Sequence, residues 1–103
     1  MNWQQAIKDY QNYLKIERGL SPNSISNYTM DLQKLASYLD EQSIPDKPIG
    51  IDRETVQQFI YDIAKTVNPR TQARIISGLK GFFNYLVFED YREDNPMDLI
   101  ESP

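Results

Sequence analysis

The chain has 103 residues, which is enough for one compact domain with a single hydrophobic core. Its net charge of −4 argues against indiscriminate nucleic-acid binding, although it leaves room for a local basic face. Cysteine and histidine are both missing, which excludes disulfides, metal sites built on thiolate or imidazole, and catalysis by a histidine base.

Two amphipathic helices are predicted in the first half of the chain, near residues 2–18 and 21–41. The apolar residues of the first recur at helical spacing: Trp3, Ile7, Tyr10 and Leu14. Gly19 suits a left-handed helix stop. Ser21 is expected to cap the second helix, with Pro22 at its first position. The apolar stripe of that helix comprises Ile25, Tyr28, Leu32, Leu35 and Leu39.

Four polar residues of the second predicted helix are expected to point away from its apolar stripe: Ser24, Asn27, Asp31 and Lys34. One interpretation is a solvated face. The alternative is a nucleic-acid contact, because serine and asparagine side chains can donate hydrogen bonds to phosphates.

The second half begins with a predicted loop over residues 42–51, where two prolines and a glycine exclude both helix and strand. Because the segment is short for a linker, we expect an ordered loop inside one domain. A third helix, capped by Asp52, is expected near 52–66 with a buried face of Val56, Phe59, Ile60 and Ile63. A long helix near 69–90 and a short one near 96–100 complete the chain. No segment alternates as a strand does, so the predicted class is all-α.

The helix predicted over 69–90 begins with an Asn68 cap and Pro69 and has two unlike faces. The apolar face comprises Ile75, Leu79, Phe82, Phe83 and Leu86. The opposite face is small, polar and basic: Arg70, Arg74, Ser77, Gly81 and Asn84, with Ala73 and Lys80 at its edge. No Asp or Glu occurs from Ile63 to Phe88. Two guanidinium groups and a hydroxyl along one helix suit phosphates and base edges, although a merely soluble surface is the alternative.

The predicted core combines residues from three helices: Leu32, Leu35, Phe59, Ile63, Leu79, Phe82 and Leu86. Searches for catalytic patterns find no glycine-rich phosphate loop and no calcium-loop spacing. The acidic pairs 40–41, 89–90 and 93–94 lie at predicted helix ends and turns, where solvation is expected. A tyrosine nucleophile would need a cluster of Arg, Lys and His, which this chain cannot assemble. We therefore expect no catalytic residue, no metal and no cofactor.

Two stretches resemble the N-terminal core-binding domain of tyrosine recombinases, the Xer and phage-integrase family. Residues 19–42, GLSPNSISNYTMDLQKLASYLDEQ, are similar to that domain's second helix at Ser21, Ser24, Tyr28, Asp31 and Leu32. Residues 73–103 are similar to its long fourth helix and exit. The matching positions there are Arg74, Ser77, Leu79, Lys80, Phe82, Tyr85, Leu86, Asn95, Pro96 and Pro103.

The resemblance implies a SAM-like bundle of four to five helices, forming a single DNA-binding domain over residues 1–103. In the family this domain is one half of a clamp around double-stranded DNA, which the second and fourth helices meet. Carried over residue by residue, the DNA-binding residues are Ser24, Arg74, Ser77 and Lys80. Helix geometry adds Asn27, Lys34, Arg70 and Thr71.

The resemblance also implies partners: a separate C-terminal catalytic domain and other recombinase protomers on the DNA. We therefore expect this chain to be a fragment that is not an enzyme by itself. A SAM-like helical module for protein–protein interaction is the competing interpretation. No apolar run is long enough to span a membrane and no signal peptide is recognisable, so a cytoplasmic protein without a membrane partner is expected.

Overall fold

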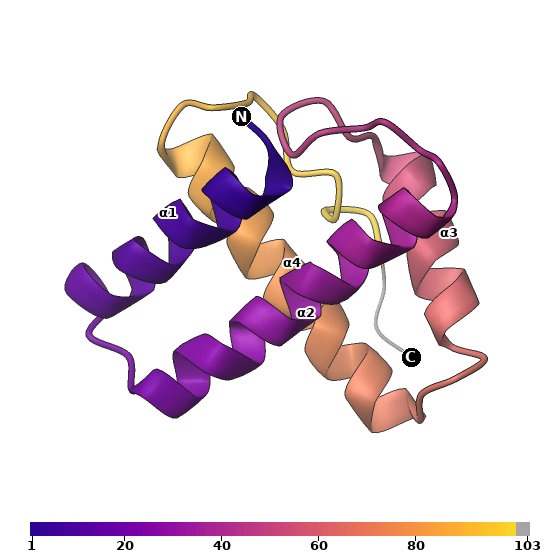
Figure 1. Ribbon diagram of the computed structural model, residues 1–103, viewed down its shortest axis with the longest axis horizontal. Helices are drawn as coiled ribbons and strands as arrows, with labels where there is room; N and C mark the ends of the chain where they lie inside the picture. The colour runs from indigo at the N-terminus through magenta and orange to yellow at the C-terminus, as the bar shows by residue number, and fades with distance from the viewer. Residues whose placement is uncertain (101–103) are drawn as a thin grey trace. The chain divides into compact units, whose positions relative to one another are not determined.

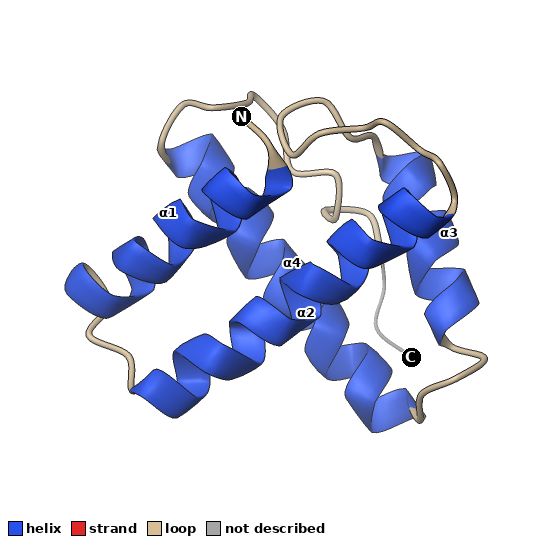
Figure 2. Cartoon of the chain, viewed as in Figure 1, coloured by secondary structure: helices blue, strands red, loops and turns tan. Residues whose placement is uncertain are grey.

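The computed structural model describes residues 1–100, and within them it contains four α-helices and no strand (Figures 1 and 2). The helices are α1 (Trp3–Ile16), α2 (Pro22–Glu41), α3 (Arg53–Ile63) and α4 (Pro69–Phe88). The predicted all-α class and the order of the four main helices are confirmed. The end of the predicted domain, which includes the family match at Pro103, lies outside the described residues.

The helices fall into two compact units, Met1–Pro48 and Ile49–Pro103. In the first unit α1 packs against α2, and in the second α3 packs against α4. The boundary lies in the loop between α2 and α3, which has neither helix nor strand, as its prolines predict. That the whole chain forms a single domain stays a prediction.

Each helix begins with a side chain that accepts a hydrogen bond from a backbone N–H one turn later. The predicted caps Ser21, Asp52 and Asn68 are confirmed, and Asn2 plays the same role for α1. The Thr55 backbone N–H lies 2.8 Å from the Asp52 carboxylate. This bond, helped by the Thr55 side chain, lowers the pKa of Asp52 below its ordinary value.

Three helices end with a residue in the left-handed conformation. Gly19 has a φ of 60° and stops α1, as predicted. Ser43 and Asp90 adopt φ values of 57° and 61° just after α2 and α4. The turn then closes with a backbone bond in each case, from Ile44 N to Leu39 O and from Tyr91 N to Leu86 O.

Two predicted helices differ from the structure, one slightly at its end and one in its form. α3 ends at Ile63, three residues before the predicted end, and residues 64–66 form turns in which the Lys65 and Thr66 N–H groups bond carbonyls only three residues earlier. Asn68 must then leave the helical region because Pro69 comes directly after it. The short helix predicted over 96–100 is a pair of tight turns, since its bonds span only three residues.

Most residues of the predicted apolar stripes are buried, although Tyr28 on α2 is 36% exposed and Trp3 and Ile25 are half-buried. The predicted core residues Leu32 and Leu35 are buried in the first unit, and Phe59, Leu79, Phe82 and Leu86 are buried in the second. The prediction is wrong for Ile63, which is half-buried because it is the last residue of α3. Burial also raises the pKa of Tyr10 on α1 to about 12, with a smaller contribution from Tyr28.

The segment after α4 packs back onto that helix. The Asn95 amide, which is buried, donates to the Lys80 carbonyl at 3.1 Å and to the Asn84 side chain at 2.8 Å. Its oxygen accepts from the Met97 backbone N–H at 2.8 Å. The Arg92 guanidinium lies 5.4 Å from the centre of the Phe83 ring. Together these contacts hold the segment against α4, and Met97 within it is buried.

Candidate nucleic-acid interface

The polar face of α4 lies on the exposed side of the helix. We call Arg70, Arg74, Ser77 and Gly81 the α4 row, because their spacing of four, three and four residues places them on one side. Arg70, Arg74 and Ser77 are exposed, and Gly81 is half-buried. The five predicted core-side residues of the helix are all buried. The assignment of the two faces of α4 is therefore confirmed.

The residues of the α4 row and its flanks differ in their exposure and in the interactions that they already make within the chain. Arg74 already takes part in an interaction within the chain. Thr71 is half-buried, and its backbone N–H is used by the Asn68 cap at 2.8 Å. Lys80 is half-buried beside the Asn95 contact. Arg70 and Ser77 are the other candidates on α4 that are exposed.

A second exposed row runs along α2. We call Asn23, Asn27, Met30, Lys34 and Ser37 the α2 row; all five are exposed and have the same alternating spacing of four and three residues. The predicted candidates Asn27 and Lys34 belong to it. Ser24 does not: it is half-buried, and its hydroxyl oxygen accepts a hydrogen bond from the Ser21 hydroxyl at 3.2 Å.

The predicted orientation of Asp31 on α2 is wrong. It is 1% exposed, whereas the polar pattern placed it on the open face with Asn27 and Lys34. It precedes Leu35 by four residues, so it shares the buried side of the helix. A buried carboxylate needs a partner, and Asp31 does take part in an interaction within the chain.

Burial of Asp31 changes the charge of the surface around α2. Asp31 is the only acid between Arg18 and Leu39. The exposed surface of that stretch therefore carries no carboxylate, and Arg18 and Lys34 are its charged residues. Reading charge from the sequence alone missed this, because a pattern of spacing does not tell which carboxylate is buried. The structure thus presents two carboxylate-free helix faces, one in each unit.

The sequence-based prediction also left Asn23 and Met30 out of the α2 row. The signal was available, because both residues stand three or four positions from Asn27. Met30 is apolar, yet it is 53% exposed. Its position between two predicted contact residues makes it part of the same surface.

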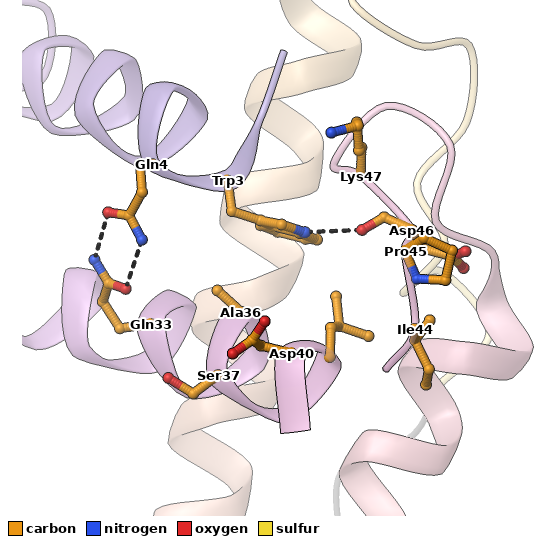
Figure 3. A pocket seen from close by; sticks show the side chains of 11 residues that line it. Trp3, Gln4, Gln33, Ala36, Ser37, Asp40, Ile44, Pro45, Asp46 and Lys47 are labelled. Atoms are coloured by element: carbon orange, nitrogen blue, oxygen red, sulfur yellow. Dashed lines mark hydrogen bonds between the residues drawn. The ribbon is translucent and has the colours of Figure 1, made fainter. Parts of the chain in front are cut away.

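The remaining features offer little for catalysis. A hollow of about 350 Å³ lies in the first unit, lined by the start of α1, the second half of α2 and the adjoining loop. Figure 3 shows its lining side chains. Gln4 and Gln33 exchange two bonds of 3.3 Å beside it, and the Trp3 indole N–H donates to the Asp46 carbonyl at 3.0 Å. In residues 1–100 no three acidic side chains gather as a metal site. Within the same range no helix is long and apolar enough to cross a membrane.

Comparison with known proteins identifies the family of these helices. Residues 7–90 match the phage integrase N-terminal SAM-like domain. This chain is also similar to tyrosine recombinases named XerD. Over 98 residues it is 35% identical to that of Listeria monocytogenes, 36% to that of Staphylococcus haemolyticus and 35% to that of Staphylococcus epidermidis. These alignments cover 94% of this chain and 33% of each relative, so the chain spans about a third of the recombinases' length. No solved structure gives a significant match.

Proposed function

We propose that this chain, which belongs to the phage integrase N-terminal SAM-like domain family, holds duplex DNA for a tyrosine recombinase through its α2 and α4 rows. The observation that supports this most is the placement of charge. A chain with 15 acidic and 11 basic residues keeps every carboxylate off the span from Ile63 to Phe88 and exposes two arginines there. An acidic protein that leaves one helix face basic has a local surface suited to a polyanion.

Each residue of the α4 row can make a distinct contact with a duplex. The Arg70 and Arg74 guanidinium groups can bond phosphate oxygens in pairs or the O6 and N7 edge of a guanine. The exposed Ser77 hydroxyl can donate to a phosphate, and the missing side chain at Gly81 allows the DNA to approach the helix backbone. Lys80 and Thr71 extend the row at its two flanks.

The α2 row would supply the remaining contacts. The Lys34 ammonium can pair with a phosphate, and the Asn27 amide can bond the N6 and N7 edge of an adenine. Ser24, which is half-buried at the start of the helix, can contribute a hydroxyl or its backbone to a nearby phosphate. Lys34 on α2 gives one cation, and Arg70, Arg74 and Lys80 on α4 give three more.

We further propose that strand cleavage is carried out by a separate catalytic domain and that other recombinase protomers share the DNA. A partner domain linked to this one would raise its effective concentration on DNA without any new contact. Binding by this chain alone should therefore be weak at physiological salt. Within the recombinase the same contacts would add to those of the linked domain.

The test is a titration of the chain against a labelled duplex at several salt concentrations. If three or four cations each neutralise one phosphate, log K should fall against log salt with a slope of roughly −2.7 to −3.6. Raising salt from about 50 to 200 mM should then weaken binding on the order of 50- to 150-fold. Absence of binding at the lowest salt would contradict the proposal and favour a protein-interaction module.

A matched pair of variants tests the place of contact in the second unit. Arg70→Gln should make the salt slope smaller by about one, because one phosphate contact is lost. Arg53→Gln removes the same charge from an exposed position at the start of α3 and should leave the slope unchanged. Arg70 is preferred to Arg74 as the probe, since Arg74 also interacts within the chain. Equal slopes for the two variants would remove α4 from the interface.

A second matched pair of variants tests the place of DNA contact in the first unit. Lys34→Gln should reduce the slope by about one, whereas Lys8→Gln on the exposed side of α1 should not. If Arg70 matters and Lys34 does not, only the α4 row contacts the DNA.

A further inference from the structure

Met30 stands at the centre of the α2 row and is the one apolar side chain in it. It is 53% exposed, with Asn27 three residues before it and Lys34 four residues after it. The core of the first unit does not use it, since Leu32, Leu35 and Leu39 fill the buried side of α2. The surrounding exposed surface, from Arg18 to Leu39, carries no carboxylate.

The polar neighbours of Met30 limit the kinds of surface it can meet. An asparagine amide and a lysine ammonium within one turn on either side present hydrogen-bond donors along the same line. A partner that accepts these donors and still has an apolar spot between them fits the row best. The major groove of B-DNA has this composition, because acceptor atoms line it and the C5-methyl group of thymine is the apolar group exposed on its base edges.

We infer that Met30 reads the methyl group of a thymine when the α2 row lies in the major groove. The inference rests on the proposed function and deepens it, since it assigns sequence preference to one side chain. The methionine side chain is unbranched, flexible and polarisable, so it can adapt to the position of a methyl group without a rigid pocket. Asn27, one turn earlier, would lie near the neighbouring base pair, where its amide suits an adenine.

The experiment first selects preferred duplexes from a random library at low salt. Each thymine of the selected site is then replaced by deoxyuridine, which removes only the C5-methyl group. For wild type, one replacement should weaken binding about fourfold, the value for losing one buried methyl-sized group. For Met30→Ala the same replacement should have no effect, so the two changes are coupled in a double-mutant cycle.

The control is Ile16→Ala, which shortens another exposed apolar side chain of the first unit; Ile16 is 75% exposed. This variant should keep the fourfold response to deoxyuridine, as wild type does. It therefore separates loss of a specific contact from a general effect of removing surface apolar area.

The possible results separate the inference from the proposed function. Binding with the expected salt slope, but with no thymine whose methyl group is coupled to Met30, overturns the inference and leaves the proposed function standing. Absence of duplex binding at low salt overturns both. A fourfold loss that is equal in wild type and Met30→Ala assigns the methyl contact to another residue and also overturns the inference.

Discussion

The helices α2 and α4 are built to the same plan but carry their charge differently. Each starts with a side-chain cap and then a proline, runs for 20 residues and has, two positions after its end, a residue with positive φ. Each exposes a row with the same alternating spacing. On α4 the basic character is visible in the sequence, whereas on α2 it emerges only once Asp31 is known to be buried.

The net charge of a helical segment is therefore a poor measure of the charge on its exposed face. By sequence, Pro22–Glu41 has three acids and one lysine, a net charge of −2. Two of those acids, Asp40 and Glu41, are in the last turn, and the third is buried. The row itself therefore presents the Lys34 charge and a series of hydrogen-bond donors.

The largest expected effect is a loss of stability when a leucine on the buried side of either helix is shortened. Leu79→Ala on α4 and Leu35→Ala on α2 should each cost about 2–5 kcal/mol of unfolding free energy, because both side chains are fully buried. Urea or thermal unfolding measures the change. A loss below about 1 kcal/mol at either site would mean that the buried face of that helix is misassigned.

The stability of the protein at high pH should depend on a buried tyrosine of the first unit and not on an exposed tyrosine of the second. The Tyr10 pKa is raised from 10.0 to about 12 by burial, so its protonated form stabilises the first unit. That stability is fully present below about pH 10 and should be lost as pH rises towards 12. Tyr10→Phe should flatten the decline in urea midpoint over this range, while Tyr61→Phe, at an exposed position in the second unit, should not. An unchanged decline in Tyr10→Phe would argue against the linkage.

A single added carboxylate should break the acid-free character of the α2 row. Asn27→Asp should weaken duplex binding on the order of fivefold at low salt, because a charge close to a phosphate interacts by about 1 kcal/mol in water. Asn12→Asp adds the same charge to an exposed site on α1 and should have a smaller effect. Affinity measured for both variants at matched salt checks this. Equal losses would mean that only the overall charge matters.

Much of the fold could be predicted because its signals are local. Caps at Ser21, Asp52 and Asn68, the prolines after two of them and the glycine after α1 each act within one turn of the chain. The predicted helix ends were less accurate, since they depend on hydrogen bonds such as those that the Ile63 carbonyl accepts. The exposed basic face of α4 was predictable because its apolar side is unambiguous.

The candidate site on α2 could be predicted only in part. Asn27 and Lys34 could be found from their spacing, whereas the burial of Asp31 depends on packing that no local pattern encodes. The partial burial of Thr71 and Lys80 was likewise not evident from their spacing along the helix. The sequence therefore indicated which two helices carry the candidate site. The structure showed which of the candidate residues on them are exposed.

The smallest expected effect tests the shared way in which α2 and α4 end. Ser43 and Asp90 are held at positive φ, which costs an L-residue roughly 1–2 kcal/mol, and glycine avoids that cost at an entropic penalty of roughly 0.5–1 kcal/mol. Each glycine substitution should therefore stabilise its unit by roughly 0.5–1 kcal/mol. Ser43→Gly should gain more than Asp90→Gly, because aspartate tolerates this conformation better than serine does.

The same conformation at Gly19 provides the reference measurement. Apart from Gly19 itself and the two residues next to it in the chain, no atom lies within 4 Å of where a Cβ at Gly19 would be placed, so the cost of Gly19→Ala is conformational. It should destabilise by an amount similar in size and opposite in sign to the gain from Ser43→Gly, as read from urea midpoints of the three variants. If Ser43→Gly and Asp90→Gly both lower stability while Gly19→Ala does so too, the hydroxyl and carboxylate of the native residues must stabilise the two long helices by more than the backbone strain costs.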